Sequence, residues 1–220
     1  MVQPAAGIAS QHMTLRSFVV RGLIAGCAVV IAIVTIICAM GSASAADAPA
    51  WTVDPANSRI IFTGRQMGAP SKGEFKRFSA SVRFDASNLA GSAVEVAIDL
   101  ASADTGNRDI DEELKRPKWF DVQRFPNGRL VTTLFRSKGG NAYEALARVT
   151  IRDVTREVVL PFVLEISQDR GDPGQEVARA SGELAISRVQ FGIGQAEWSD
   201  TAIVADEVRV HVEILARRKK

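Results

Sequence analysis

Few residues in this chain have side chains that could form an enzyme site. After residue 46 there is one histidine, His211, and no cysteine, because Cys27 and Cys38 both lie earlier. Nucleophilic catalysis pairs a nucleophile with a base, and a zinc-type site needs several histidine or cysteine ligands. A single histidine, placed at an outward position of the last expected strand, builds neither arrangement. The sequence therefore predicts no catalytic residues and no metal site.

Residues 109–113 hold the densest group of acidic residues, four carboxylates in five positions. They fall in the first turns of an expected helix, where the helix dipole favours negative charge. This explains the carboxylates more simply than a bound cation does. Gly192 and Gly194 have the spacing of a phosphate-binding loop, but they open no helix, so a phosphate site is not predicted there.

Charge limits the partners of the chain. The sequence has 27 basic and 25 acidic residues, and two of the basic ones, Arg16 and Arg21, precede residue 46, so the remainder is formally neutral. A nucleic-acid partner would require a basic face. We expect the basic end, residues 217–220, to be a solvated, frayed tail. If a ligand carries a phosphate or polar head, arginine can pair with it bidentately, and the candidates for that contact are Arg65, Lys72, Arg77 and Arg188.

The first 46 residues have the pattern of an export signal. Arg16 and Arg21 precede an uncharged apolar run, residues 22–40, and the small-residue pair Ala43-x-Ala45 follows it. Cleavage after Ala45 or Ala46 and retention as a membrane anchor through residues 22–40 both remain open, because the apolar run approaches the length that spans a bilayer. We expect residues 1–45 to be this leader and residues 46–220 to be one exported, periplasmic domain.

The remaining chain alternates apolar and polar residues as β-strands do. A first strand is expected over residues 51–67, interrupted at Asp54-Pro55, and a second over residues 72–84. Residues 94–100 and 208–214 alternate most regularly, and Gly139-Gly140-Asn141 is typical of a hairpin turn. About eight antiparallel strands joined by short turns predict an all-β fold, either a closed up-and-down barrel or a sandwich. Residues 158–164 are apolar on both strand faces. Either something covers the outer face of this strand, or the strand packs outward on a neighbouring element and inward on an apolar lumen. Spacing alone leaves two alternatives, a barrel filled with side chains and a barrel with a ligand cavity.

One helix is expected, within residues 104–126. Thr105 and Asn107 are both candidate N-caps, and Pro117 ends the helix. Trp119 and Phe120 follow directly. A short capped helix that ends in aromatic residues, with strands on both sides, predicts a segment that closes one mouth of the β structure.

Six stretches together resemble the YceI-like family of exported bacterial proteins, also described as polyisoprenoid-binding proteins. They are residues 51–62, 68–78, 104–109, 119–126, 149–156 and 187–194, in family order. The chain departs from the family pattern at Asn57, Ala80, Asp153 and Ser187, where the family usually has His, Gly, Gly and Asn. The resemblance implies a lipocalin-like, eight-stranded antiparallel barrel with an elongated apolar cavity. It also implies that a long isoprenoid or other amphiphilic lipid, such as a quinone, is bound in the periplasm, with no other cofactor.

Seven residues are predicted to contact this ligand, mainly through the resemblance: Phe78, Trp119, Phe120, Tyr143, Phe162, Phe191 and Arg188. Each buried methylene of a lipid chain contributes about 0.8 kcal/mol, so a long chain should be held tightly. The alternative function is a non-catalytic interaction module, with a filled barrel, that docks on a membrane redox partner. A homodimer is compatible with either function.

Overall fold

The computed structural model describes residues 47–220, so the expected leader, residues 1–45, lies outside the described residues together with Cys27 and Cys38. The strands are β1 (Ala50–Val53), β2 (Arg59–Gln66), β3 (Ala69–Phe75), β4 (Phe78–Arg83), β5 (Ala93–Asp99), β6 (Ala103–Asp104), β7 (Asn127–Gly139), β8 (Ala142–Ile151), β9 (Val154–Gln168), β10 (Gln175–Ser187) and β11 (Glu207–Lys219). The helices are α2 (Arg108–Leu114) and the short 3-10 turns η1 (Pro55–Asn57), η2 (Leu89–Gly91), η3 (Leu100–Ser102), η4 (Val189–Phe191) and η5 (Ala196–Ser199).

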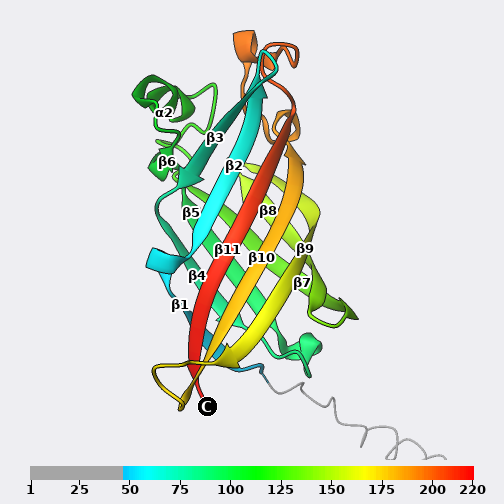
Figure 1. The fold of residues 1–220 in the computed structure, drawn as a ribbon. Helices are drawn as coiled ribbons and strands as arrows, with labels where there is room; N and C mark the ends of the chain where they lie inside the picture. The colour runs from blue at the N-terminus through cyan, green and yellow to red at the C-terminus, as the bar shows by residue number, and fades with distance from the viewer. Residues whose placement is uncertain (1–46) are drawn as a thin grey trace, which may run out of the picture. The chain divides into compact units, whose positions relative to one another are not determined.

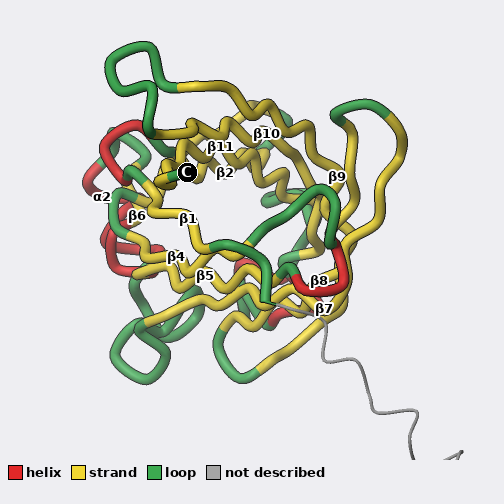
Figure 2. The backbone as a smooth tube through the Cα atoms, turned by 90° about the horizontal axis from the view of Figure 1, so that it is seen from below, coloured by secondary structure: helices red, strands yellow, loops and turns green. Residues whose placement is uncertain are grey.

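The strands form a closed, eight-stranded antiparallel barrel with one short α-helix, as predicted (Figures 1 and 2). Neighbours follow the order β1, β4, β5, β7, β8, β9, β10, β11, and the pairing of β1 with β11 closes the ring. β1 and β2 share one position in the wall, because both pair with β11. In Figure 1, α2, the β2–β3 turn and residues 189–205 lie at the upper end, and the chain's C-terminus lies at the lower end.

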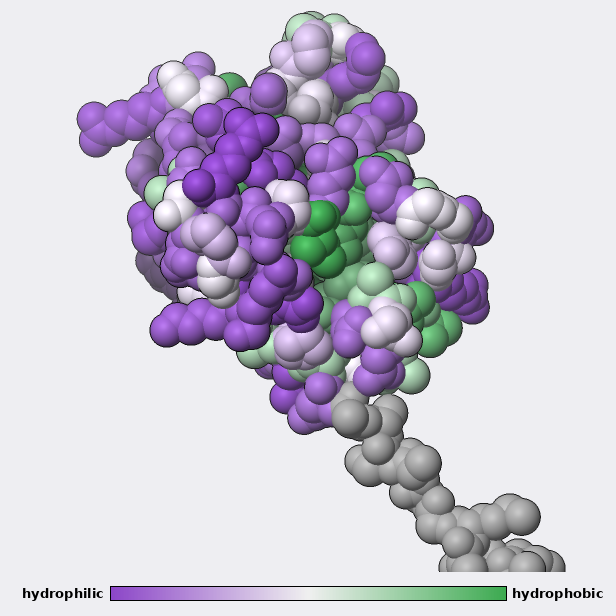
Figure 3. Space-filling model, turned by 60° about the horizontal axis from the view of Figure 1, so that its bottom comes forward, coloured by the Kyte–Doolittle hydropathy of each residue, from purple (hydrophilic) through white to green (hydrophobic). Residues whose placement is uncertain are grey.

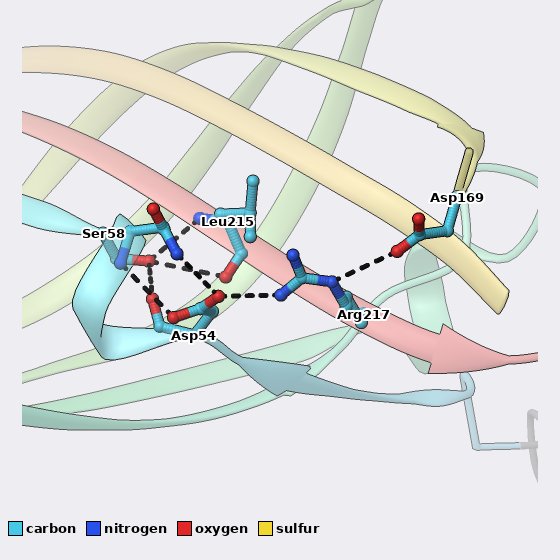
Figure 4. Close-up of polar contacts among 6 residues, drawn as sticks. Asp54, Ser58, Asp169, Leu215 and Arg217 are labelled. Carbon is cyan, nitrogen blue, oxygen red and sulfur yellow. Dashed lines mark hydrogen bonds and ion pairs between the residues drawn. The ribbon is translucent and has the colours of Figure 1, made fainter. Parts of the chain in front are cut away.

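The interruption between β1 and β2 was expected at Asp54-Pro55 and is present there. Asp54 caps η1 by accepting from the backbone N–H of Asn57, and its Oδ2 accepts from Arg217 Nη1 at 2.7 Å (Figure 4). The hydroxyl of Ser58, which is buried, donates to Asp54 O at 2.7 Å and accepts from the backbone N–H of Leu215 at 2.9 Å. Because these bonds reach β11, they fix the kink against the barrel wall.

The expected single strand over residues 72–84 is wrong, since the chain there forms β3 and β4 with different neighbours. β3 pairs with β2 and with the short β6, whereas β4 pairs with β1 and β5. At the junction, the hydroxyl of Ser102 accepts from the backbone N–H of Arg77 at 3.0 Å. This side-chain bond takes the place of a strand partner and lets the chain change direction.

The expected frayed basic tail is also wrong, because β11 continues to Lys219. Arg217 bridges Asp54 and Asp169, at 2.7 and 3.3 Å, and so joins three segments of the lower end (Figure 4). Arg218 pairs with Glu176 at 2.7 Å, and its guanidinium lies 4.5 Å from the ring centroid of Trp51. The basic residues are therefore ordered by acidic and aromatic partners that are distant in the sequence.

The pairing between β9 and β10 covers only part of their length. It joins residues 162–168 to residues 176–182 and stops beside Pro161, which has no N–H to donate. At the same place, a Cβ on Gly182 would lie 2.6 Å from the carbonyl oxygen of Pro161, so the two backbones approach more closely than a larger residue permits. Beyond this point, η4 contacts β9.

The expected helix is present as α2, which occupies only residues 108–114 of the segment 104–126. Asn107 is the N-cap, accepting from the N–H groups of Asp109 and Ile110, and α2 ends at Leu114. The chain after it is held to the β8–β9 turn by Arg152, whose guanidinium donates to the carbonyl oxygens of Pro117 and Trp119 at 2.8 and 2.6 Å. Among residues 47–220, no helix is long and apolar enough to cross a membrane.

Candidate functional site

A cavity of about 510 Å³ occupies the interior of the barrel. Its walls are inward-facing apolar residues of the strands, and the two stretches that alternate most regularly contribute as predicted. β5 and the adjoining η3 supply Val94, Val96, Ile98 and Leu100, and β11 supplies Val208, Val210, Val212 and Ile214. Figure 3, which brings the lower end forward, shows a hollow with hydrophobic residues inside and hydrophilic residues around it.

Small inward residues provide much of the space. Ala145, Ala178, Ala180 and Gly182 border the cavity where larger residues would fill it. The sequence left a filled and a hollow barrel open, and the structure shows the hollow one.

An aromatic cluster narrows the lower end of the cavity. Phe84 contacts Phe135, Tyr143 and Phe162 edge-to-face, with ring centroids 5.4, 5.6 and 6.4 Å away. The indole N–H of Trp51 donates to the carbonyl oxygen of Phe84 at 2.9 Å. All five rings are carried by strands or by the residue directly after one, so the sheet itself fixes their positions.

The upper end of the cavity is built differently, from α2, the β2–β3 hairpin and residues 189–205. Trp119 and Trp198 pack together there with ring centroids 5.7 Å apart. The indole N–H of Trp198 donates to Glu113 Oε1 at 3.2 Å, which ties η5 to α2. The polar residues that border the cavity gather mainly here: Arg65, Gln66, Ser71, Thr105, Asp109 and Glu113.

Arg188 organises this upper end from inside. It is 2 % exposed, and its guanidinium donates to four backbone carbonyl oxygens, those of Ile193, Gly194, Val204 and Ala205, at 2.5 to 3.2 Å. Burial lowers the pKa of the Arg188 guanidinium, and the nearby Asp206 partly offsets this. Arg188 therefore holds the two sides of the 189–206 segment together. Because the carbonyl groups occupy the N–H donors of its guanidinium, Arg188 is not free to bind a phosphate.

Trp119, which lies next to Arg188, has a buried indole N–H without a hydrogen-bond partner in the described part of the chain. It is 9 % exposed and borders the cavity, and its ring centroid lies 6.0 Å from the Arg188 guanidinium carbon. Its Nε1 is the one buried side-chain nitrogen or oxygen within residues 47–220 that has no hydrogen-bond partner. Buried polar groups are nearly always paired, so a lone N–H beside a cavity calls for an explanation.

Of the seven predicted ligand contacts, Trp119, Phe120, Phe162 and Arg188 border the cavity. The other three, Phe78, Tyr143 and Phe191, pack outside its lining. Tyr143 is the cross-strand partner of Phe162, and the two rings stack side by side with their centroids 5.5 Å apart. The ligand-binding role of all seven residues stays a prediction.

The basic residues that were candidates for contact with a ligand head also differ in whether they border the cavity. Arg65 borders the cavity at its upper end, and its Nη1 donates to Gly68 O at 3.3 Å. Lys72 is exposed on β3, and Arg77 pairs with Asp99 at 2.8 Å. The sequence did not identify Glu113 or Trp198 as site residues. They lie 85 residues apart in the chain, so no local pattern shows their contact, and only the charge of one and the size of the other could have drawn attention to them.

His211 Nε2 lies 3.2 Å from Glu213 Oε1 on the outside of β11. No group of three or more potential metal ligands occurs among residues 47–220.

A closed antiparallel barrel around an apolar cavity defines the class, a small lipocalin-like β-barrel. The chain belongs to the YceI-like family, since the YceI-like domain matches residues 51–216, and the predicted resemblance is thereby confirmed.

Curated relatives match over part of their length. A UPF0312 protein of Photorhabdus laumondii is 33% identical over 122 residues, which cover 54% of this chain and 62% of that protein. A UPF0312 protein of Vibrio vulnificus is 26% identical over 119 residues, covering 53% of this chain and 63% of the relative. The chain thus spans less than two thirds of the length of these relatives.

Solved structures share the fold. BcnA of Burkholderia cenocepacia is 32% identical, with a TM-score of 0.67, covering 74% of this chain and 98% of BcnA. A polyisoprenoid binding domain from Saccharophagus degradans has a TM-score of 0.57 at 11% identity and covers 77% of this chain and 98% of that domain. At this low identity, the second likeness shows the fold alone.

Proposed function

We propose that this protein is a non-catalytic carrier that holds a long-chain amphiphile, of the isoprenoid or quinone type, inside its barrel. The observation that carries the proposal is the apolar cavity. Its volume of about 510 Å³ lies within the range of ligand pockets, roughly 300–1,000 Å³. Burying methylene groups in such a space contributes about 0.8 kcal/mol each, which favours a long chain over a small polar molecule.

The family supports the same ligand class. A relative of the same fold is described as a polyisoprenoid binding domain. The leader pattern in residues 1–45 supports a periplasmic location, either as a cleaved form or as a form anchored through residues 22–40. A carrier in that compartment would move or store lipid that water does not dissolve.

The first test is direct. The chain would be expressed with its leader, purified from the periplasm and extracted with organic solvent, and both the extract and the intact protein would be analysed by mass spectrometry. A stoichiometric long-chain lipid is the expected result. Recovery of ligand-free protein, from a host that makes such lipids, would count against the carrier.

A matched pair of variants then connects the lipid to the cavity. Phe162→Asp places a carboxylate on the lining, and we expect it to abolish lipid binding because a charge in an apolar space is costly to desolvate. Val163→Asp places the same charge on the next residue, which faces outward and is 44 % exposed, so its lipid content should not change. Circular dichroism would check that both variants fold. Normal lipid content in folded Phe162→Asp would contradict the proposal.

A further inference from the structure

The charged side chains at the upper mouth of the cavity are unevenly distributed. Asp109 and Glu113 lie one helical turn apart on the cavity side of α2, beside the apolar Ile110 and Leu114. Arg65 is the one basic residue that joins them there from the β2–β3 side. A ligand head at this mouth would therefore meet two carboxylates and one guanidinium.

The Asp109 carboxylate remains available to interact with such a head. No residue within the range 47–220 makes a hydrogen bond or ion pair to the Asp109 carboxylate, and Asp109 is exposed. Glu113 is half-buried and already engaged, since its Oε1 accepts from the indole N–H of Trp198 at 3.2 Å and its Oε2 pairs with Arg116 at 3.3 Å. An anionic head would be repelled chiefly by Asp109, because Arg116 balances the charge of Glu113. This repulsion is stronger than in bulk water because the cavity wall is apolar.

The other arginines that border the cavity do not offset this repulsion. The guanidinium of Arg188 is engaged by four backbone carbonyl oxygens. Arg129 lies at an outward position of β7 and pairs with Glu95. Neither presents a free pair of N–H groups to a phosphate.

Trp119 supplies a hydrogen-bond donor for the ligand head. Its indole N–H is buried, borders the cavity through its own ring and lacks an acceptor. An unpaired buried donor is costly, and a ligand oxygen that reaches it would remove that cost. A hydroxyl or carbonyl oxygen would accept this hydrogen bond without bringing a negative charge to Asp109 and Glu113.

We propose that the upper end of the cavity is a head-group site for an uncharged head that bears a hydrogen-bond-accepting oxygen. Trp119 Nε1 donates to that oxygen, Asp109 disfavours phosphate and carboxylate heads, and the apolar tail runs toward the aromatic cluster at the lower end. The inference rests on the proposed carrier function, and it narrows the ligand class from any long amphiphile to uncharged ones.

The test compares three probes with the same branched hydrocarbon skeleton length: geranylgeraniol, geranylgeranyl diphosphate and phytane. Each would be titrated into delipidated full chain, and binding would be followed by displacement of a fluorescent hydrophobic dye. We expect the alcohol to bind on the order of tenfold more tightly than the diphosphate at low salt. The difference should shrink as ionic strength rises, because salt screens the carboxylates at the mouth.

Two sets of variants test which residues cause the difference in affinity between the probes. Asp109→Asn should raise diphosphate affinity several-fold and leave phytane affinity unchanged. Glu112→Gln is the matched control, since Glu112 lies on the same helix but is exposed, pairs with Lys115 and does not border the cavity, so it should change nothing. Trp119→Phe should weaken the alcohol about fivefold, the value of one ordinary hydrogen bond, without weakening phytane.

The outcomes separate the inference from the carrier function. If none of the probes binds, the carrier proposal itself fails. If all bind but the diphosphate equals or exceeds the alcohol, only the head-group inference fails. If Trp119→Phe weakens phytane as much as the alcohol, the residue shapes the wall and does not donate, which overturns its assigned role. The Asp109→Asn variant tests the selection against anions independently of how well Trp119→Phe folds.

Discussion

The two ends of the cavity are closed by different means. At the lower end, the rings of Trp51, Phe84 and Phe135 are fixed by strands, and outside them Arg217 links Asp54 with Asp169. At the upper end, α2 and residues 189–206 cover the barrel, and few ladder bonds attach them. The lower end is thus closed by residues of the sheet itself, whereas the upper end is closed by segments that pack on top of the sheet.

This difference predicts unequal local stability. Segments with few ladder bonds open more readily than paired strands, and lids are drawn from such segments. The upper cover depends on Arg188, since its guanidinium joins residues 193–194 to residues 204–205. We therefore expect ligand exchange at the upper end, while the lower end keeps its shape.

The largest effect should come from removing the buried guanidinium. Arg188→Met leaves four carbonyl oxygens without their donor, and we expect the free energy of unfolding to fall by about 4 kcal/mol, measured by urea denaturation. Amide exchange should rise first in residues 189–206. Arg209→Met, at an exposed arginine that pairs with Glu183 and Glu207, should change stability by less than about 1 kcal/mol. Equal losses in both variants would remove the distinction between the two ends.

A smaller loss is expected at the lower end. Phe84→Ala removes the ring that contacts three others, and we expect stability to fall by about 3 kcal/mol. Amide exchange should rise across β4 and β5 and not in residues 189–206. Val163→Ala, on the exposed outer face, should cost less than about 0.5 kcal/mol. Faster exchange at the upper end in Phe84→Ala would mean that the ends are coupled.

The smallest effect concerns acid stability at the lower end. The hydrogen bond from Arg217, with a further one from Asn57, lowers the pKa of the Asp54 carboxyl below its ordinary value. The folded form therefore binds this proton less readily than the unfolded chain, so the contribution is present above about pH 4 and is lost as pH falls through the lowered pKa. Asp54→Asn should be less stable than the parent at neutral pH, and the gap should narrow below about pH 4.

Chemical denaturation across pH 2–7 would measure this gap. Glu157→Gln is a suitable control, because Glu157 is exposed and makes no ion pair among the described residues. A constant gap between Asp54→Asn and the parent over the whole pH range would contradict the assignment.

Much of the barrel could be predicted because strand alternation is local. Residues 94–100 and 208–214 have inward sides that can be read from their spacing, and both border the cavity. The hairpin at residues 139–141 was also visible, since Gly139 and Gly140 have φ of 97° and 58°, which glycine adopts without strain. The N-cap Asn107 follows the same local logic.

The features that failed depend on distant partners. Arg217 is ordered by Asp54, 163 residues earlier, and no local pattern shows that contact. The division into β3 and β4 depends on Ser102, 25 residues after the junction. Alternation also cannot separate a ring that borders a cavity from a ring that packs beside it, which is why Phe162 and Tyr143 looked alike in the sequence.

Pro161 has a consequence for how the protein behaves at high concentration. Residues 154–161 of β9 pair with β8 on one side only, so their other edge carries backbone groups that no strand of the described chain uses. Free strand edges are templates for pairing with another chain, and they promote aggregation. A proline at the point where the ladder stops, and η4 lying against β9 beyond it, protect this edge from intermolecular sheet growth. Pro161→Val would therefore put the solubility of the barrel at risk.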